Sequence, residues 1–247
     1  MTTRRIAYVT GGMGGIGTAI CKRFCQQGYI VIAGCGPNST RKESWLANMK
    51  SEGFDVIASE GNVGDWFSTK HAFDKVKTEI GLVDILVNNA GITRDATFRK
   101  MDRDQWSQVI NTNLNSMFNV TKQVIDDMVE RRWGRIINIS SVNGQKGQFG
   151  QTNYATAKAG IHGFTMALAL EVANHGVTVN TVSPGYIGTQ MVRTIRPDVL
   201  GQIVSSIPMK RLGEPDEIAS LVAWLASDDA GFTTGADYSI NGGLHMH

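Results

Sequence analysis

Residues 10–17 read Thr-Gly-Gly-Met-Gly-Gly-Ile-Gly. This segment follows the apolar run 6–10, which predicts a strand, and opens a stretch of helical period that runs to Gln27. Glycines allow a tight turn and a close approach of the backbone to a pyrophosphate, whose charge is met by backbone N–H groups and the positive end of the helix. The segment therefore predicts a dinucleotide-binding loop; the alternative is a flexible turn that binds nothing.

Two glycine patterns fit this loop. Gly12, Gly14 and Gly17 form G-x-G-x-x-G, whereas Gly11, Gly15 and Gly17 form T-G-x-x-x-G-x-G. The glycines alone do not distinguish the two patterns.

Short apolar, β-branched runs alternate with segments of helical period along the chain, which predicts right-handed crossovers and a parallel sheet covered on both faces. We therefore expect an α/β fold, a single Rossmann-type doubly wound domain over residues 1–247, with ligands at the carboxyl ends of the strands. The predicted strands are 6–10, 29–33, 55–58, 84–87, 135–140, 177–182 and 238–240, and the predicted helices include 66–80, 104–131, 154–174 and 215–225.

The composition favours a soluble protein without a macromolecular partner. The 24 basic and 22 acidic residues give a dispersed net charge of +2, which argues for neither a nucleic-acid nor a membrane partner. No apolar run approaches the ~18 residues of a membrane span, and no apolar signal region begins the chain, so we expect a soluble, cytoplasmic protein. Cys21, Cys25 and Cys35 are interpreted as structural thiols, and the scattered histidines predict no metal site.

Cofactor choice depends on the second predicted strand. An NAD-binding unit places an Asp or Glu about 20 residues after the loop to hold the ribose 2′-hydroxyl. Residues 28–42 contain no acid, and Arg41 and Lys42 follow the strand instead. Because a guanidinium offers forked donors to phosphate oxygens, this pair predicts NADPH; the alternative is that both side chains are merely solvated at a helix start.

Three residues are candidates for proton-transfer chemistry. Tyr154 and Lys158 are spaced i, i+4, so on a helix their side chains leave the same face. Ser141 lies at the carboxyl end of the predicted strand 135–140. A phenol with a pKa of ~10 needs a stabilised anion to act near neutrality, and the Lys158 ammonium can supply it. The Ser141 hydroxyl can hold a carbonyl oxygen on which charge develops.

Five motifs in this order resemble the short-chain dehydrogenase/reductase family over essentially the whole chain: the loop 10–17, Asn88-Asn89-Ala90-Gly91, Thr112-Asn113-Leu114, Ser141 with Tyr154-x-x-x-Lys158, and Pro184-Gly185. The resemblance favours the T-G-x-x-x-G-x-G pattern. It implies that Tyr154 donates the proton, Lys158 binds the nicotinamide ribose and lowers the pKa of Tyr154, Ser141 holds the substrate oxygen and Asn113 anchors a water for proton relay. The implied cofactor-binding residues are Gly11, Gly12, Met13, Gly14, Gly15, Ile16, Gly17, Gly36, Arg41, Gly61, Asn62, Val63, Asn89, Ala90, Gly91, Ile92, Lys158, Pro184, Gly185 and Ile187.

Two positions depart from the family pattern. Many NADP-using members have a basic residue inside the glycine loop, where this chain has Met13 and Gly14, so phosphate selection rests on Arg41 and its neighbours. The family often places Asp-Val against the adenine, whereas this chain has Gly61-Asn62-Val63; an Asn amide can still bond to adenine edges.

The resemblance extends to members that reduce short β-ketoacyl thioesters, through residues 88–95, 144–151, 183–186 and 241–246. It implies NADPH-dependent reduction of acetoacetyl-CoA to an (R)-3-hydroxyacyl-CoA, as in polyhydroxybutyrate synthesis, by a homotetramer. Segment 188–207 is interpreted as a lid, in which Arg193 and Arg196 either meet CoA phosphates or are solvated. The implied substrate-binding residues are Asp95, Ser141, Gln148, Phe149, Gln151, Tyr154, Tyr186 and Arg196.

Two other functions remain open. A reductase of β-ketoacyl groups on acyl carrier protein would use the same site and would need a basic docking surface, for which Arg131, Arg132 and Arg135 are candidates. A redox-sensing NADP-binding protein without catalysis would not need Tyr154, Lys158, Ser141 and Asn113 together.

Overall fold

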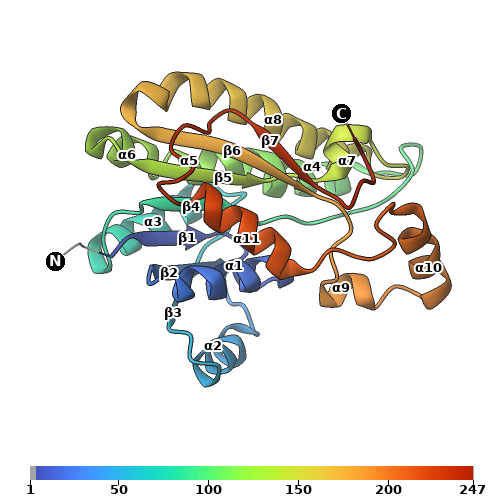
Figure 1. Cartoon of the computed structure of the whole chain (residues 1–247), viewed down its shortest axis with the longest axis horizontal. Helices are drawn as coiled ribbons and strands as arrows, with labels where there is room; N and C mark the ends of the chain where they lie inside the picture. Colours follow the sequence, from blue (N-terminus) through green and yellow to red (C-terminus); the bar gives the residue numbers. More distant parts are fainter. Residues whose placement is uncertain (1–3, 247) are drawn as a thin grey trace.

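The computed structural model describes residues 4–246, apart from the side chains of Met191 and Arg193, and contains one seven-stranded parallel sheet (Figure 1). The strand order is β3-β2-β1-β4-β5-β6-β7, which confirms the predicted doubly wound α/β fold. The strands are β1 (Ile6–Val9), β2 (Ile30–Cys35), β3 (Val56–Glu60), β4 (Ile85–Asn88), β5 (Gly134–Ile139), β6 (Val177–Pro184) and β7 (Asp237–Ile240).

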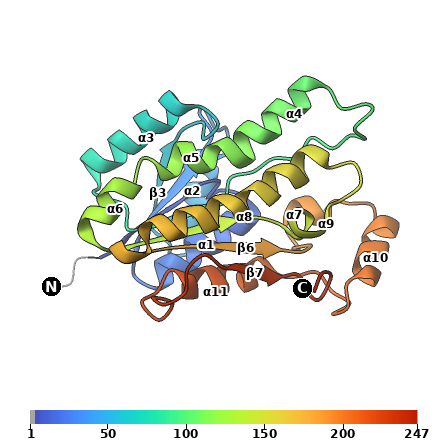
Figure 2. The same ribbon diagram turned by 90° about the horizontal axis from the view of Figure 1, so that it is seen from above.

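Helices cover both faces of the sheet (Figure 2). One face carries α1 (Gly15–Gln26), α2 (Lys42–Ser51) and α11 (Pro215–Leu225), and the other carries α3 (Trp66–Glu79), α5 (Ser116–Thr121), α6 (Ile125–Arg131) and α8 (Thr152–Val172). The remaining helices are α4 (Arg103–Ile110), α7 (Val142–Lys146), α9 (Gln190–Arg193) and α10 (Pro197–Ser206). Every residue of the central strands β1, β4, β5 and β6 is buried. The sequence of β1 is accordingly apolar throughout, whereas β5 and β6 also bury polar side chains, among them Asn138 and Asn180.

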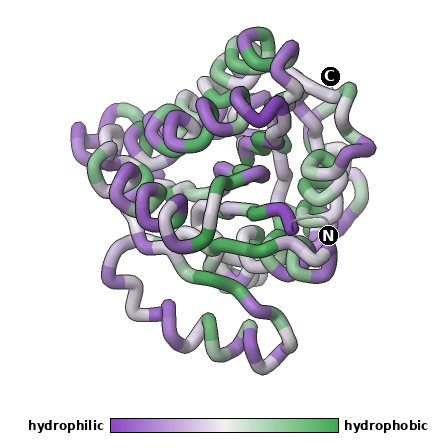
Figure 3. The backbone as a smooth tube through the Cα atoms, turned by 90° about the vertical axis from the view of Figure 1, so that its left-hand side faces the viewer, coloured by the Kyte–Doolittle hydropathy of each residue, from purple (hydrophilic) through white to green (hydrophobic). Residues whose placement is uncertain are grey.

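The apolar interior forms two clusters, one on each face of the sheet. Phe24 of α1 and Ile218 of α11 belong to one cluster, and Phe73 of α3 and Met128 of α6 to the other. In Figure 3 the strands run as hydrophobic segments through the middle, while the surrounding helices carry hydrophilic residues on their outer turns. Within residues 4–246 no helix is long and apolar enough to cross a membrane.

Residues 104–131 were predicted to form one continuous helix, and this prediction is wrong because the helix is interrupted. The structure has α4, then a π-helical turn at Asn111–Asn115, then α5, and a further break before α6. The periodicity is helical throughout, but the Asn113 side chain turns inward and binds the backbone of Ile92, which an uninterrupted α-helix would not position. Tertiary contact therefore overrides the local pattern at this point.

Strand order reverses between β1 and β4, because β1 continues to β2 on one side while β4 continues to β5 on the other. The loops that follow β1 and β4 therefore diverge and leave a crevice at the carboxyl ends of the strands. Residues 10–17 and 89–92 form the two sides of this crevice.

Candidate active site

The loop after β1 has the backbone of an anion site. Gly11 has a φ of 60°, a left-handed conformation that favours glycine, and a Cβ at Gly17 would lie 2.3 Å from the Gly11 carbonyl oxygen. Helix α1 begins after Gly14 with no side-chain cap and no acid in its first turn. Helices α3 and α4, in contrast, are capped by Asp65 and Asp102. The N–H groups that open α1 are thus left for a ligand with negative charge, so this loop fits a pyrophosphate.

The loop after β4 is bonded directly to the glycine loop. Asn89 Nδ2 donates to the Thr10 and Gly11 carbonyl oxygens at 3.0 and 3.1 Å, while the Thr10 hydroxyl accepts from the N–H groups of Asn89 and Ala90 at 2.9 and 3.0 Å. A Cβ at Gly91 would lie 3.6 Å from Lys158 Nζ. These contacts place three of the predicted cofactor residues on one continuous surface beside Lys158.

At the carboxyl end of β2 the structure separates the two basic residues. Arg41 is exposed at the start of α2, but Lys42 Nζ lies 2.6 Å from Glu60 Oε1 and 3.3 Å from Glu43 Oε1. The hydrogen bond between Lys42 and Glu60 raises the pKa of Lys42 and lowers the pKa of Glu60. Lys42 is therefore already neutralised, and the predicted phosphate selection reduces to Arg41.

Glu60 was not predicted from the sequence, because it lies well beyond the roughly 20 residues after the loop at which an NAD-binding acid is expected. The parallel register pairs Cys35 of β2 with Glu60 of β3, so an acid 25 positions away arrives at the same edge of the sheet. Glu60 Oε2 also accepts from the Asn38 N–H at 3.3 Å, in the loop that follows Gly36.

The predicted adenine side lies at the end of β3, next to Gly61. Asn62 is exposed, and its Oδ1 accepts from the Gly64 N–H at 3.1 Å, so its Nδ2 amino group is the part left to donate to an adenine ring. Asn119 Nδ2 donates to the Val63 carbonyl oxygen at 3.0 Å and holds this turn against α5.

The structure brings Tyr154 and Lys158 of α8 close to Ser141, which precedes α7. The Tyr154 hydroxyl is hydrogen-bonded to Ser141, and Lys158 Nζ lies 5.6 Å from the centre of the Tyr154 ring. Lys158 is 4% exposed, and its ammonium donates to the Ile139 carbonyl oxygen at 2.8 Å. Ser141 caps α7, with its Oγ accepting from the Asn143 N–H at 3.1 Å.

The electrostatics differ from the expectation for Tyr154. Burial raises its pKa, the hydrogen bond with Ser141 works in the opposite direction, and the nearby Asp95 carboxylate raises the pKa further. The net effect is a raised pKa rather than the lowering expected from Lys158. Burial also lowers the pKa of Lys158 to about 8, because a charged ammonium is disfavoured away from water. At neutral pH the phenol thus keeps its proton and the lysine keeps its charge.

Asn113 lies beside this group but has a different contact from the one expected. Its Oδ1 accepts from the Ile92 N–H at 2.8 Å, and its Nδ2 donates to the Ile92 carbonyl oxygen at 2.9 Å. Both ends of the amide are therefore engaged in holding the loop after β4, so any water near Asn113 would have to be held by backbone groups of the π-helical turn.

The predicted substrate residues divide into two groups. Gln151 Nε2 donates to Asp95 Oδ2 at 2.8 Å, and Gln151 Oε1 accepts from Asn143 Nδ2 at 2.9 Å, so a polar rim runs from Asp95 to the Ser141 cap. Gln148 and Phe149 project into solvent, and Phe149 is 88% exposed. Asn143 was not predicted, because only the fold brings it next to Gln151.

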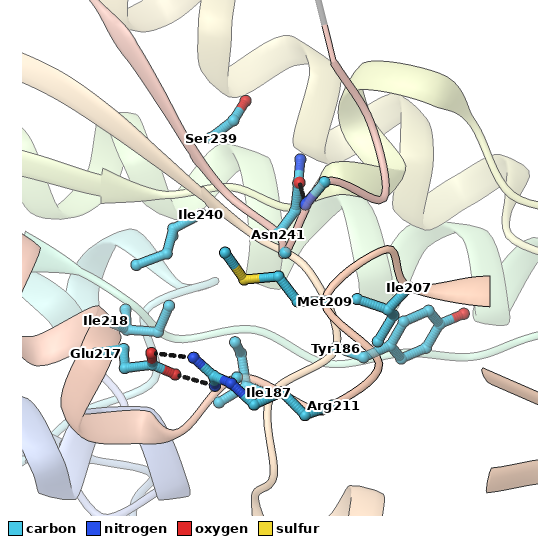
Figure 4. Close-up of a pocket in the computed structure, with 13 residues that line it drawn as sticks. Tyr186, Ile187, Ile207, Met209, Arg211, Glu217, Ile218, Ser239, Ile240 and Asn241 are labelled. Atoms are coloured by element: carbon cyan, nitrogen blue, oxygen red, sulfur yellow. Dashed lines mark hydrogen bonds and ion pairs between the residues drawn. The ribbon is translucent and has the colours of Figure 1, made fainter. Parts of the chain in front are cut away.

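A cavity of about 340 Å³ lies between the lid base, α11 and β7 (Figure 4). Tyr186 and Ile187 line it together with Met209, and an ion pair between Arg211 and Glu217, at 2.7 Å, closes one side. None of the three proton-transfer candidates lines it.

The predicted lid has anchored ends. The Gly188 N–H donates to the Gly213 carbonyl oxygen at 2.7 Å, and a Cβ at Gly15 would lie 2.7 Å from Thr189 Cγ2, so the lid base packs on the glycine loop. Arg196 is exposed and pairs with Asp198 at 3.0 Å, which weakens the case for it as a phosphate ligand. The side chain of Arg193 lies outside the described part of the chain. Gly185 packs on Asn241 and donates to the Ile240 carbonyl oxygen.

The basic residues suggested for carrier-protein docking lie at the amino end of the parallel strands, where β5 begins. Arg135 is 4% exposed, and its guanidinium lies over the Trp133 ring. The guanidinium of Arg5 also lies over this ring, with its Cζ 3.7 Å from the ring centre, and donates to Asp228 at 2.9 Å. Arg131 pairs with Asp84, and Arg132 donates to the Asn174 carbonyl oxygen. These side chains are paired within the chain at the start of β5, and their role in docking a carrier protein stays a prediction.

Comparison with known proteins gives consistent matches over the chain. The family model for short chain dehydrogenases matches residues 5–200. Acetoacetyl-CoA reductase of Cupriavidus necator is 72% identical over 99% of both chains. Nodulation protein G of Azospirillum brasilense is 57% identical over 98% of this chain and 99% of its own length. The 3-oxoacyl-[acyl-carrier-protein] reductase of Haemophilus influenzae is 43% identical over 98% of both chains.

Proposed function

Because the chain belongs to the short-chain dehydrogenase family, we propose that this oxidoreductase reduces acetoacetyl-CoA to an (R)-3-hydroxyacyl-CoA with NADPH. The observation that carries the proposal is the meeting of Tyr154, Ser141 and Lys158 at the mouth of a pyrophosphate-fitting crevice. The 72% identity to a relative named for this reaction supports the choice of substrate.

The bound nicotinamide cofactor would supply a hydride to the keto carbon. The Ser141 hydroxyl would donate to the keto oxygen, on which negative charge grows as the carbon–oxygen double bond opens. Tyr154, whose raised pKa keeps it protonated, would transfer its proton to that oxygen, leaving a phenolate. The Lys158 cation, 5.6 Å from the ring centre, would stabilise the phenolate in a buried site where charges interact strongly.

The choice of NADPH rests on Arg41. Its guanidinium is exposed at the start of α2, and Glu60, the acid at the end of the neighbouring strand β3, is paired with Lys42. A planar guanidinium binds phosphate oxygens in a forked arrangement, which a ribose 2′-hydroxyl cannot use.

For the thioester we favour CoA over a carrier protein. Arg99, Lys100 and Arg103 are exposed in the segment that follows Asp95, and in residues 4–246 none of the three makes an ion pair. Phe98, beside them, is 71% exposed. These cations and the aromatic ring suit the phosphates and adenine of CoA, but a basic surface would also suit a carrier protein. The choice of CoA therefore rests on the 72% identity to a relative named acetoacetyl-CoA reductase. The Haemophilus relative keeps carrier-bound substrates as the second candidate.

We also propose that the protein works as a cytoplasmic homotetramer. The outer face of α8 exposes Met166 and Leu170, the latter 85% exposed, and Trp224 on α11 is 41% exposed next to Tyr238. Apolar side chains of this size are usual at subunit contacts. Light scattering of the purified protein measures the assembly directly, and a monomer would contradict the proposal.

The function is tested by steady-state rates with acetoacetyl-CoA and its acyl-carrier-protein counterpart, each with NADPH and with NADH. We expect the highest kcat/KM for acetoacetyl-CoA with NADPH and an R product by chiral analysis. Tyr154→Phe should abolish turnover while NADPH still binds, because the ring is kept and the proton donor is lost. Appreciable turnover in Tyr154→Phe would remove Tyr154 as the proton donor.

A further inference from the structure

A polar cluster lies between the candidate active site and the edge strand, with Asp237 of β7 at its centre. The Ser183 hydroxyl donates to Asp237 Oδ1 at 2.6 Å, and Gln145 Nε2 donates to Oδ2 at 2.8 Å. His162 Nε2 lies 3.4 Å from the same Oδ2 and 2.9 Å from Ser140 Oγ. One carboxylate thus accepts hydrogen bonds from β6 and α7, and His162 of α8 lies close to it.

The neighbours of His162 determine which ring nitrogen carries a proton. The Ser140 hydroxyl donates its single proton to the Lys158 carbonyl oxygen at 2.8 Å, so its oxygen faces His162 as an acceptor. Asp237 is an acceptor as well. Nε2 is therefore the protonated nitrogen, and the ring connects the Asp237 carboxylate to Ser140, a residue only 3% exposed.

The three elements joined by Asp237 are those that carry the proposed chemistry. Gln145 belongs to α7, which begins at Ser141, and His162 lies one helical turn beyond Lys158 on α8. Ser183 directly precedes Pro184-Gly185 at the end of β6. We infer that Asp237, acting through His162 and Gln145, is a positioning residue that fixes Ser141 and Lys158 relative to each other; this inference rests on the proposed function.

Two other roles for the cluster do not fit the geometry. A hydrolytic triad needs its Ser and Asp on different nitrogens of the His ring, whereas Ser140 and Asp237 both approach Nε2, and the Ser140 proton is already committed. A direct electrostatic role is also unsupported, because burial is the cause that lowers the pKa of Lys158. The cluster therefore holds Ser141 and Lys158 in position and does not supply charge at the reacting atoms.

The first test compares two substitutions of the ring. His162→Gln keeps an N–H donor near the place of Nε2, whereas His162→Leu removes it. We expect kcat for acetoacetyl-CoA with NADPH to fall by about 10- to 100-fold in His162→Leu, since a misplacement of about 1 Å costs up to about 10²-fold. KM for NADPH should be unchanged, and His162→Gln should recover most of the loss. Equal losses in both variants would indicate proton transfer through the imidazole, and no loss in either would exclude positioning; each result overturns the inference.

A second pair of variants separates positioning from general stability. Asp237→Ala should lower kcat with little effect on KM for NADPH. Asp228→Ala is the matched control. Asp228 also accepts hydrogen bonds from distant parts of the chain, those of Arg5 and Trp133, but it lies near the amino ends of the strands, away from the candidate active site. Asp228→Ala should lower the thermal midpoint and leave kcat unchanged. A kcat loss of the same size in both variants would overturn the inference.

The protonated nitrogen of His162 can be measured in the wild-type protein, without a variant and without substrate. Nitrogen-15 NMR of the wild-type imidazoles should show His162 protonated at Nε2 without cofactor or substrate. A neutral ring protonated at Nδ1 would overturn the inference. Failure of the wild type to reduce acetoacetyl-CoA would instead overturn the proposed function and leave this spectrum as the deciding result.

Discussion

Replacing Lys158 by Met should make the protein more stable while it abolishes reduction. Lys158 is 4% exposed, and within residues 4–246 the hydrogen-bond partner of its ammonium is the Ile139 carbonyl oxygen. Burial lowers its pKa from 10.5 to about 8. A tenfold change in a protonation equilibrium corresponds to about 1.4 kcal/mol, so the buried cation costs about 3 kcal/mol at neutral pH.

Met has a similar length and no charge, so the substitution recovers this cost. It also leaves the Ile139 carbonyl oxygen without its donor, which costs about 1 kcal/mol. We therefore expect the free energy of unfolding to rise by about 2 kcal/mol at pH 7, equivalent to roughly 5 °C in the thermal midpoint of a chain of this size.

The gain should depend on pH in a defined direction. The unfolded chain keeps Lys158 protonated up to about its usual pKa of 10.5, whereas the folded chain releases the proton above about pH 8. Between these values the unfolded state holds more protons, so the wild type becomes more stable as pH rises. The advantage of Lys158→Met should then be full below pH 8 and lost as pH approaches 10.5.

Urea unfolding of the cofactor-free protein at pH 7 and at pH 10 measures both effects. Lys50→Met, at an exposed position on α2, is the control and should show no such pH dependence. A Lys158→Met protein that is less stable than the wild type at pH 7, or whose gain is equal at both pH values, would refute the account of Lys158 as a buried, costly cation.

Three further predictions concern the cofactor crevice. Arg41→Ala should raise KM for NADPH by about tenfold or more, as expected when a charge-assisted contact worth 1.5–3 kcal/mol is lost, with little change for NADH; an unchanged preference would exclude Arg41 as the phosphate ligand. Glu60→Gln should lower KM for NADPH, because it frees the Lys42 ammonium; equal KM values would show that Lys42 does not reach the phosphate. Gly17→Ala should abolish NADPH binding measured by fluorescence, since its Cβ would lie 2.3 Å from the Gly11 carbonyl oxygen, and normal binding would show that the loop can shift.

Several features of this protein follow from the sequence alone, because they depend on local pattern. Each of the seven predicted strands is present, and their β-branched residues, as in β6, are the local signal that predicted them. The spacing of Tyr154 and Lys158 puts both on one face of a helix whatever surrounds it. Ser141 follows the end of a strand, and in a parallel sheet that edge is where loops meet.

Other features depended on which distant residues the fold brings together. Glu60 neutralises Lys42 because β2 and β3 pair in one register, and Asn113 interrupts a helix because its amide reaches Ile92. The raised pKa of Tyr154 comes from burial and from Asp95, neither of which a motif records. Asp237 lies far along the chain from Ser141, yet it holds the helix that Ser141 begins. Local pattern determined the strands and the positions of the candidate catalytic residues along the chain. Long-range packing determined which side chains are paired, which pKa values shift and which residues hold the site in place.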